Sequence, residues 1–290
     1  VIRTVDLGAD RQAEYMAIPD EVNPMMGNRG IRLCLDRKKM FKAQLRAIYR
    51  ASAYGNINLM YPMITSEDEL DEIEKLIREV KKGLDEKNIP YKNIRTGIMI
   101  ETPAAVMISE ELGKRVDFLS LGTNDLTQYT LAMDRQNLLL KDKYNDHHPA
   151  LVKMIRMVTE AGHKSGCEVY ICGELAADSN LTEAFIQMGV DGLSVVPACV
   201  LPVRKAIRSS YADEANRPAE SSKREIISEK TKILRISMLI SVDISHRILR
   251  IFLTESSTHG LLLFSIEAVR GNISVPVKVI EVQAPGRFPK

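Results

Sequence analysis

The sequence has no strong excess of charge of either sign, few aromatic residues and few cysteines. The net charge is +2, and basic residues are interspersed with acidic ones. They do not form the basic stripe, interleaved with aromatic residues, of a nucleic-acid binder. The four cysteines, at positions 34, 167, 172 and 199, show no CxxC spacing, which argues against a disulfide framework or a zinc site. We therefore expect no nucleic-acid partner and a reducing, cytoplasmic location.

Uninterrupted apolar runs long enough to span a membrane are also lacking. The most apolar window, residues 233–253, is broken by the charged side chains of Arg235, Asp243, Arg247 and Arg250, which a membrane-spanning helix would not tolerate. The N-terminal segment VIRTVDLGAD has no signal-peptide pattern, because no apolar stretch follows a charged one. We expect no membrane insertion.

Charge is shared unevenly along the chain. Residues 1–216 hold 28 basic and 31 acidic residues, whereas residues 217–290 hold 12 and 7. Such an asymmetry marks a compositional boundary, and we divide the sequence into a domain of residues 1–215 and an unassigned tail of residues 216–290. The tail contains three strand-like runs, ISMLISVD, LLLFSIEAV and ISVPVKVIEV. Their short connections favour antiparallel pairing, and we do not expect them to complete the sheet of the first domain.

Before residue 216, six short β-rich runs each end in a polar or glycine turn, and five are followed directly by a helical pattern. Strands that alternate with helices and are apolar on nearly every residue predict a parallel sheet covered by helices. The expected strands are residues 1–6, 57–64, 96–102, 116–123, 168–174 and 191–197. The expected helices are residues 37–53, 66–86, 104–113, 149–165, 180–188 and 201–209. The second helix opens with a capping-box spacing at Ser66.

The fold class that this pattern predicts is α/β. A (β/α)₈ TIM barrel closes such an alternation naturally, because the polar residues at the strand ends would meet at the C-terminal rim, where these barrels keep their active sites. Only six units are visible. We therefore expect either a barrel that lacks its first two strands or an open sheet.

Carboxylates and arginines are expected at this rim. Glu101 ends the third expected strand and Asp125 follows the fourth. Two carboxylates from neighbouring strands suit Mg²⁺, which takes one or two carboxylates and completes its shell with water and substrate oxygens; alternatively, both cap helices or pair with lysines. Arg3, Arg29 and Arg135 sit at strand ends or in glycine-bearing loops, where a guanidinium could bind phosphate or carboxylate or form an ordinary surface ion pair.

One cysteine and two histidines are also considered as site residues. Cys172 at a strand end could serve as an acid beside cationic groups or be an inert apolar residue. His147 and His148, in a loop before a helix, are expected to be solvated.

Five motifs together resemble a known family. VIRTVDLGAD, NPMMGNRGIRLCLDR, GIMIETPAA, LSLGTNDLTQYTLAMDR and YICGELAAD resemble, in this order, the phosphoenolpyruvate-binding barrel of Enzyme I, the phosphoenolpyruvate–protein phosphotransferase of the bacterial sugar phosphotransferase system. The resemblance runs from residue 1 to about residue 210. Pyruvate phosphate dikinase and phosphoenolpyruvate synthase share similar segments and form an alternative, although QYTLAMDR and CGELA are closer to Enzyme I.

The resemblance implies three sets of site residues. The metal ligands would be Glu101 and Asp125, holding Mg²⁺. The residues that bind phosphoenolpyruvate would be Arg3, Arg29, Asn124 and Arg135. Cys172 would deliver a proton to the methylene carbon as the enolate becomes pyruvate.

Partners also follow from the resemblance. In the family, the phosphoryl group passes to a histidine on a separate domain and then to the carrier protein HPr, in sugar uptake, and the enzyme is a homodimer. The sequence begins at what corresponds to the third barrel strand, and none of its five histidines matches the phosphohistidine site. Two further hypotheses therefore remain: a truncated regulatory or binding homologue without transferase activity, and a non-functional remnant.

Overall fold

The computed structural model describes residues 1–7, 18–216, 235–237, 250–253, 264–270 and 273–279. The chain forms two units, one of residues 1–12 and 19–241 and the other of residues 13–18 and 242–290. Every candidate site residue lies in the first unit.

A parallel sheet of seven strands forms the centre of the first unit, and its order is β1-β2-β3-β4-β5-β6-β7. Each strand pairs in parallel with the next along the chain, so that Leu121 in β4, for example, lies opposite Ile171 in β5. A sheet that follows chain order is that of a (β/α)₈ barrel, whereas a doubly wound sheet reverses order at a switch point. The predicted α/β class and barrel-type strand order are confirmed. The strands are β1 Ile2–Arg3, β2 Asn58–Tyr61, β3 Arg95–Ile100, β4 Phe118–Gly122, β5 Glu168–Cys172, β6 Gly192–Ser194 and β7 Arg235–Ser237.

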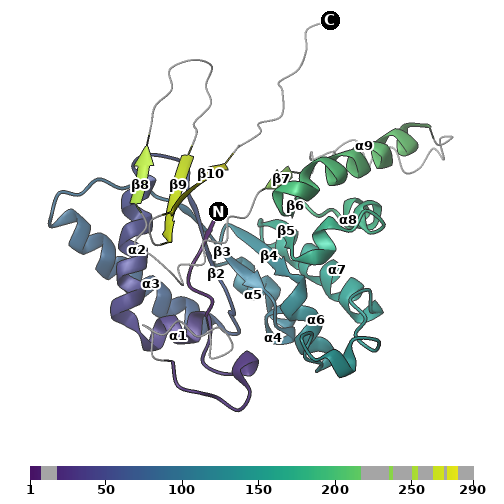
Figure 1. Ribbon diagram of the computed structural model, residues 1–290, viewed down its shortest axis with the longest axis horizontal. Helices are drawn as coiled ribbons and strands as arrows, with labels where there is room; N and C mark the ends of the chain where they lie inside the picture. The colour runs from purple at the N-terminus through teal and green to yellow at the C-terminus, as the bar shows by residue number, and fades with distance from the viewer. Residues whose placement is uncertain (8–17, 217–234, 238–249, 254–263, 271–272, 280–290) are drawn as a thin grey trace, which may run out of the picture. The chain divides into compact units, whose positions relative to one another are not determined.

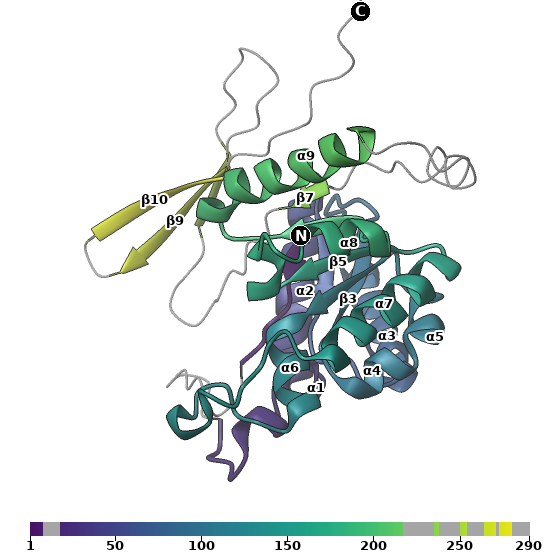
Figure 2. The ribbon, with the colours of Figure 1, turned by 90° about the vertical axis from the view of Figure 1, so that its right-hand side faces the viewer.

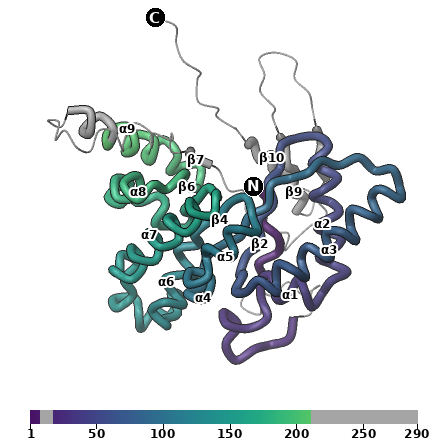
Figure 3. Tube along the Cα trace, turned by 180° about the vertical axis from the view of Figure 1, so that it is seen from behind, coloured from purple at the N-terminus to yellow at the C-terminus, as the bar shows by residue number. Residues whose placement is uncertain are grey.

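Helices connect these strands. They are α1 Ile31–Asp36, α2 Lys38–Ser52, α3 Glu67–Asp85, α4 Pro103–Met107, α5 Ser109–Gly113, α6 Thr123–Leu131, α7 Pro149–Lys164, α8 Thr182–Met188 and α9 Val200–Asn216. In Figure 1, α2 and α3 lie beside β2, and α7 and α8 lie beside β5 and β6. Figure 3 shows α2 and α3 next to each other from behind. Among the helices that the structure describes, none is both long and apolar enough to cross a bilayer.

Local sequence signals account for the starts of some helices, namely α3, α4 and α7, which have side-chain caps. The capping box is present as predicted: the Ser66 side chain accepts a hydrogen bond from the Glu69 backbone N–H, and the Glu69 carboxylate accepts one from the Ser66 N–H. One expectation was wrong. Residues 104–113 form two short helices, because the backbone of Ile108 (φ −113°, ψ 25°) leaves the helical region. Residues 123–125, which follow β4 directly, form the first turn of α6.

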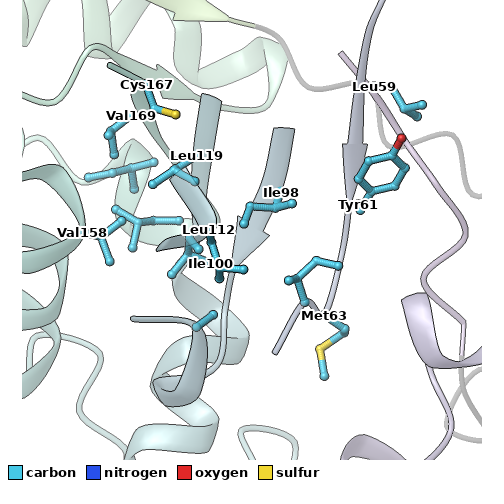
Figure 4. Close-up of a cluster of buried hydrophobic side chains, with 14 of the residues drawn as sticks. Leu59, Tyr61, Met63, Ile98, Ile100, Leu112, Leu119, Val158, Cys167 and Val169 are labelled. Carbon is cyan, nitrogen blue, oxygen red and sulfur yellow. The ribbon is translucent and has the colours of Figure 1, made fainter. Parts of the chain in front are cut away.

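Side chains of the strands alternate between two buried clusters. Ile98 and Ile100 of β3 belong to the larger cluster, between the sheet and its helices, which Figure 4 shows together with Leu119, Leu112 and Val158. The intervening Met99 belongs to a smaller cluster on the opposite face of the sheet, together with Met60, Phe118 and Cys172. Because both faces are buried, the strands are apolar on nearly every residue.

One tail run adds a strand to the main sheet. β7 pairs in parallel with β6, with Ile236 opposite Leu193, so part of the run ISMLISVD extends this sheet. The tail runs were not expected to complete the sheet of the first domain, and the seven strands described are fewer than the eight of a closed barrel. The second unit contains an antiparallel sheet of order β10-β9-β8, which confirms antiparallel pairing for the two later runs. Its strands are β8 Arg250–Leu253, β9 Phe264–Arg270 and β10 Ile273–Val279.

Candidate active site

Arg29 lies in the loop between β1 and α1, within a buried charge cluster. Its Nη2 atom is 3.1 Å from Oδ2 of Asp6 and 3.4 Å from Oδ2 of Asp125. The guanidinium therefore joins the carboxylate that follows β1 to the one in the first turn of α6. Burial alone lowers the pKa of Arg29, but the two carboxylates outweigh it and raise this pKa above its ordinary value. Figure 2 shows α1 and α6 at the same end of the sheet.

Two further arginines flank this cluster. The Nη1 atom of Arg3 is 3.3 Å from Oδ2 of Asp6, and Nη2 of Arg135 is 3.6 Å from Oδ1 of Asp125. Their side chains are 20% and 22% exposed, whereas that of Arg29 is 5% exposed. The structure thus brings together the three arginines that the sequence singled out, with the two outer ones bordering solvent.

Glu101 follows β3 and is almost completely buried. Its Oε1 atom accepts a hydrogen bond of 2.6 Å from the backbone N–H of Met63, which has the positive φ of 58° that non-glycine residues rarely adopt. Burial, and then the nearby Asp6 and Asp125 carboxylates, raise the pKa of Glu101 to about 8. Gly122 makes room for it, because a Cβ atom there would lie 2.8 Å from Glu101 Oε2.

These carboxylates fit a magnesium ion. Oδ1 of Asp125 is buried and has no hydrogen-bond partner among the described residues, and Glu101 is destabilised in its charged form by two neighbouring carboxylates. A divalent cation would offset both costs. No group of three or more His, Cys, Asp or Glu residues within the described ranges is arranged to hold a metal alone. Two protein carboxylates are nevertheless sufficient for Mg²⁺, which keeps several waters and binds substrate oxygens.

Asn124 connects α6 to the segment after β5. Its Oδ1 atom accepts a hydrogen bond of 3.0 Å from the Glu174 backbone N–H, an arrangement that identifies the other side-chain atom as the donor Nδ2. The close approach requires Gly173, whose φ is +93° and where a Cβ atom would lie 2.5 Å from Thr123 Oγ1. Asn124 therefore holds the segment after β5 through its carbonyl oxygen and has its amide Nδ2 as a donor group.

Cys172, the last residue of β5, lies in the small cluster on the opposite face of the sheet from the helices. Its Sγ atom donates to the Leu121 carbonyl at 3.2 Å and accepts from the Ser120 hydroxyl at 3.5 Å. Burial raises the pKa of the Cys172 thiol to about 11. The thiol therefore retains its proton at neutral pH, as a proton donor must.

Known proteins have sequences similar to this one. Residues 1–212 match the family described as "PEP-utilising enzyme, PEP-binding domain". The chain belongs to this family. It is 43% identical over 223 residues to the phosphoenolpyruvate-protein phosphotransferase of Buchnera aphidicola subsp. Acyrthosiphon pisum (strain APS), covering 77% of this chain and 39% of that protein. It is 40% identical over 232 residues to the protein of the same name from Bacillus subtilis (strain 168), covering 80% and 40%.

Membership of this family confirms the resemblance inferred from the five motifs. The chain spans about two fifths of the length of the curated relatives that it matches. Among solved structures, a citrate lyase from Burkholderia xenovorans LB400 is 16% identical, with a TM-score of 0.46, over 65% of this chain and 57% of that one. A pyruvate kinase from Cryptosporidium parvum is 10% identical, with a TM-score of 0.43, over 71% and 41%.

Asp6 and Tyr129 belong to the same site in this PEP-binding domain, although the sequence motifs assign them no role. Asp6 is held by Arg3 and Arg29, and its position at the end of the run VIRTVD was the signal that could have identified it. Tyr129 stands one turn after Asp125 on α6, on the same helix face. Its hydroxyl donates to the Met25 carbonyl and accepts from Arg29 Nη1.

Proposed function

We propose that this PEP-binding domain binds phosphoenolpyruvate with Mg²⁺ and forms the catalytic part of a phosphoenolpyruvate–protein phosphotransferase. One observation carries the proposal: the cations suited to phosphate and carboxylate and the carboxylates suited to a metal meet at the ends of neighbouring strands, around Arg29 and Asp125. Active sites of (β/α)₈ barrels lie at this edge. The names of the relatives support the same activity.

The positive side chains would bind the substrate. Arg3, Arg29 and Arg135 would hold the phosphate and carboxylate groups, for which the planar guanidinium offers paired donors. Nδ2 of Asn124 would donate to a phosphoryl oxygen. Because these groups are held in place before the reaction, they stabilise the developing charge without reorganising.

Glu101 and Asp125 would hold the metal. When bound, Mg²⁺ supplies Lewis-acid stabilisation of the phosphoryl and enolate oxygens. The chain's own contribution is to keep both carboxylates close together, with Glu101 oriented by the Met63 N–H.

The bond between phosphorus and the enolate oxygen breaks while phosphorus bonds to a histidine nitrogen on a separate domain. The enolate then takes the Sγ proton of Cys172 at its methylene carbon and becomes pyruvate, and water returns a proton to the thiolate. From the histidine, the phosphoryl group would pass to HPr in sugar uptake. We further propose a cytoplasmic homodimer, as the resemblance implies.

Calorimetric titration of phosphoenolpyruvate into the full chain, with and without Mg²⁺, tests the proposal. We expect magnesium-dependent binding by the wild type and its loss in Asp125→Ala. Asp71→Ala is the matched control, because Asp71 pairs only peripherally with Arg115 in an exposed position. Equal binding by all three proteins would show that the site is assigned wrongly.

A module that binds phosphoenolpyruvate without transferring phosphate is the second candidate. It requires only the cluster around Arg29 and Asp125, without a histidine that accepts the phosphoryl group. Adding a purified phosphohistidine domain and measuring pyruvate release distinguishes the two functions. A transferase releases pyruvate in proportion to the added domain, whereas a binding module releases none.

A further inference from the structure

Tyr129 links two segments that carry substrate-binding candidates. It is part of α6, which also carries Asn124 and Asp125, and its ring packs against the main core. Its hydroxyl reaches the loop between β1 and α1, where it meets the short 3₁₀ helix η3, Pro24–Met26, and Arg29. No sequence motif marks this connection.

Two hydrogen bonds form the link. The Tyr129 hydroxyl donates to the backbone carbonyl of Met25, and Arg29 Nη1 donates to the same hydroxyl at 3.5 Å. Burial raises the pKa of Tyr129, so the hydroxyl keeps the proton that it donates. One side-chain oxygen therefore holds both the loop backbone and the guanidinium.

Residues 21–28 of the loop also make local bonds. The Glu21 carboxylate accepts the Asn28 N–H at 2.9 and 3.1 Å, and Arg32 Nη1 donates to the carbonyls of Met26 and Gly27 at 3.2 and 3.0 Å. These contacts attach the loop to itself and to α1. Among the described residues, Tyr129 and the Arg29–Asp125 ion pair attach it to α6.

One N–H group of Arg29, at Nε, has no hydrogen-bond partner within the described residues. The Nη1 atom of Arg29 faces Tyr129 and Met25 Sδ, and its Nη2 faces Asp6 and Asp125. The Nε atom is buried. Buried donors normally have partners, so this guanidinium is held by its two ends with one N–H left for a ligand.

We propose that Tyr129 is a positioning residue, whose hydroxyl attaches the loop of residues 24–29 to α6 and thereby sets the Arg29 guanidinium for an anionic substrate group. The claim that Arg29 is positioned for a substrate rests on the proposed function. The claim that Tyr129 attaches the loop to α6 is independent of it.

Tyr129→Phe in the full chain tests this role, since it removes the hydroxyl and keeps the ring that packs in the core. Tyr91→Phe is the matched control, because it also removes a tyrosine hydroxyl hydrogen bond, to Asp85, but on the surface near α3. The measurements are amide hydrogen exchange of residues 19–30 and calorimetric titration of phosphoenolpyruvate with Mg²⁺. Thermal unfolding verifies that both variants fold.

In Tyr129→Phe we expect amide exchange in residues 19–30 to be about fivefold faster, as follows from losing one ordinary hydrogen bond, with exchange in α7 unchanged. The dissociation constant for phosphoenolpyruvate should rise about five- to tenfold. Tyr91→Phe should change neither quantity. A rise in the dissociation constant without faster loop exchange, or equal effects in both variants, would overturn the positioning role.

Failure of the proposed function gives a different result. If the wild type does not bind phosphoenolpyruvate, the binding function is wrong, and loop exchange alone decides the role of Tyr129. Faster exchange in Tyr129→Phe then still supports the attachment, and unchanged exchange overturns it.

Discussion

The Nη2 atom of Arg29 lies 3.4 Å from Oδ2 of Asp125, although the two residues are 96 positions apart in the chain. Their side chains are only 5% and 10% exposed, so both charges are largely removed from water. In such a pair, removing one partner leaves an uncompensated buried charge. Removing one member of this pair should therefore destabilise the fold as well as disturb the candidate site.

Replacing Arg29 should be costly for stability. In Arg29→Leu, both Asp6 and Asp125 lose a buried cationic partner, and we expect the free energy of unfolding to fall by about 3–5 kcal/mol. Arg115→Leu is the control, because its ion pairs with Asp71 and Glu74 are near the surface, where a pair contributes about 0–1 kcal/mol. Urea denaturation measures both; equal losses would contradict a special role for the buried cluster.

Glu101→Gln should have the opposite effect when no metal is present. Burial and two neighbouring carboxylates raise the pKa of Glu101 to about 8, and the glutamine carbonyl can still accept the Met63 N–H. Since one pKa unit corresponds to about 1.4 kcal/mol, we expect an increase in unfolding free energy of about 1–3 kcal/mol at pH 7.5 in a chelator.

Adding Mg²⁺ tests whether Glu101 is a metal ligand. A ligand that binds only the folded state stabilises it, so Mg²⁺ should raise the melting temperature of the wild type and not that of Glu101→Gln. Glu110→Gln, which removes a surface partner of Lys164, should respond like the wild type. If Mg²⁺ stabilised all three proteins equally, Glu101 would not be a ligand.

The buried thiols should resist alkylation. Burial raises the pKa of Cys172 to about 11, of Cys167 to about 11 and of Cys34 to about 12, and the thiolate is the reactive form. Cys199 is partly exposed. With iodoacetamide at pH 8, mass spectrometry should find Cys199 modified first, and all four at similar rates in urea. Native Cys172 reacting as fast as Cys199 would contradict its role as a protonated acid.

His147 is exposed, as expected, and it also bridges two carboxylates. Its Nε2 lies 2.6 Å from Oδ2 of Asp178 and its Nδ1 lies 2.7 Å from Oδ1 of Asp146, and these hydrogen bonds raise the pKa of His147 above its ordinary value of 6.5. A raised histidine pKa stabilises the folded state fully below pH 6.5, and the contribution is lost as pH rises through the higher folded value.

An NMR titration of the His147 ring carbons tests this. The midpoint should lie above that of an unfolded histidine, and Asp178→Asn should move it back towards 6.5. An identical midpoint in the wild type and in Asp178→Asn would show that the contact with Asp178 does not persist in solution.

Features encoded locally were predictable from sequence. The strand around Ile98 could be recognised because burial on both faces requires an apolar residue at almost every position, and the capping box at Ser66 needs only residues three apart. The strand ends also located Glu101, Asp125 and Cys172, since parallel strands end at one edge of the sheet.

Features that depend on tertiary contacts were not predictable. The connection of Tyr129 to Met25 joins residues 104 positions apart, and no spacing rule relates them. Likewise, Thr123 Oγ1 donates to the Cys172 carbonyl at the end of β5, and Asn124 Oδ1 accepts from the Glu174 N–H, contacts between residues about 50 positions apart. The parallel pairing of β7 with β6 joins residues far apart in the chain, and the composition of the strand does not specify it.

The pairing of β7 with β6 gives the last prediction. Ile236 lies opposite Leu193 in a parallel register from Gly192 to Ser194, and proline is poorly tolerated inside a paired strand because it lacks an N–H and its ring crowds the neighbouring strand. In Ile236→Pro we expect amide exchange of residues 192–194 to be several-fold faster. Ile266→Pro, in the central strand of the second unit, should instead speed exchange in residues 250–253 and 273–279. If amide exchange of residues 192–194 is unchanged in Ile236→Pro, β6 is not stabilised by pairing with β7.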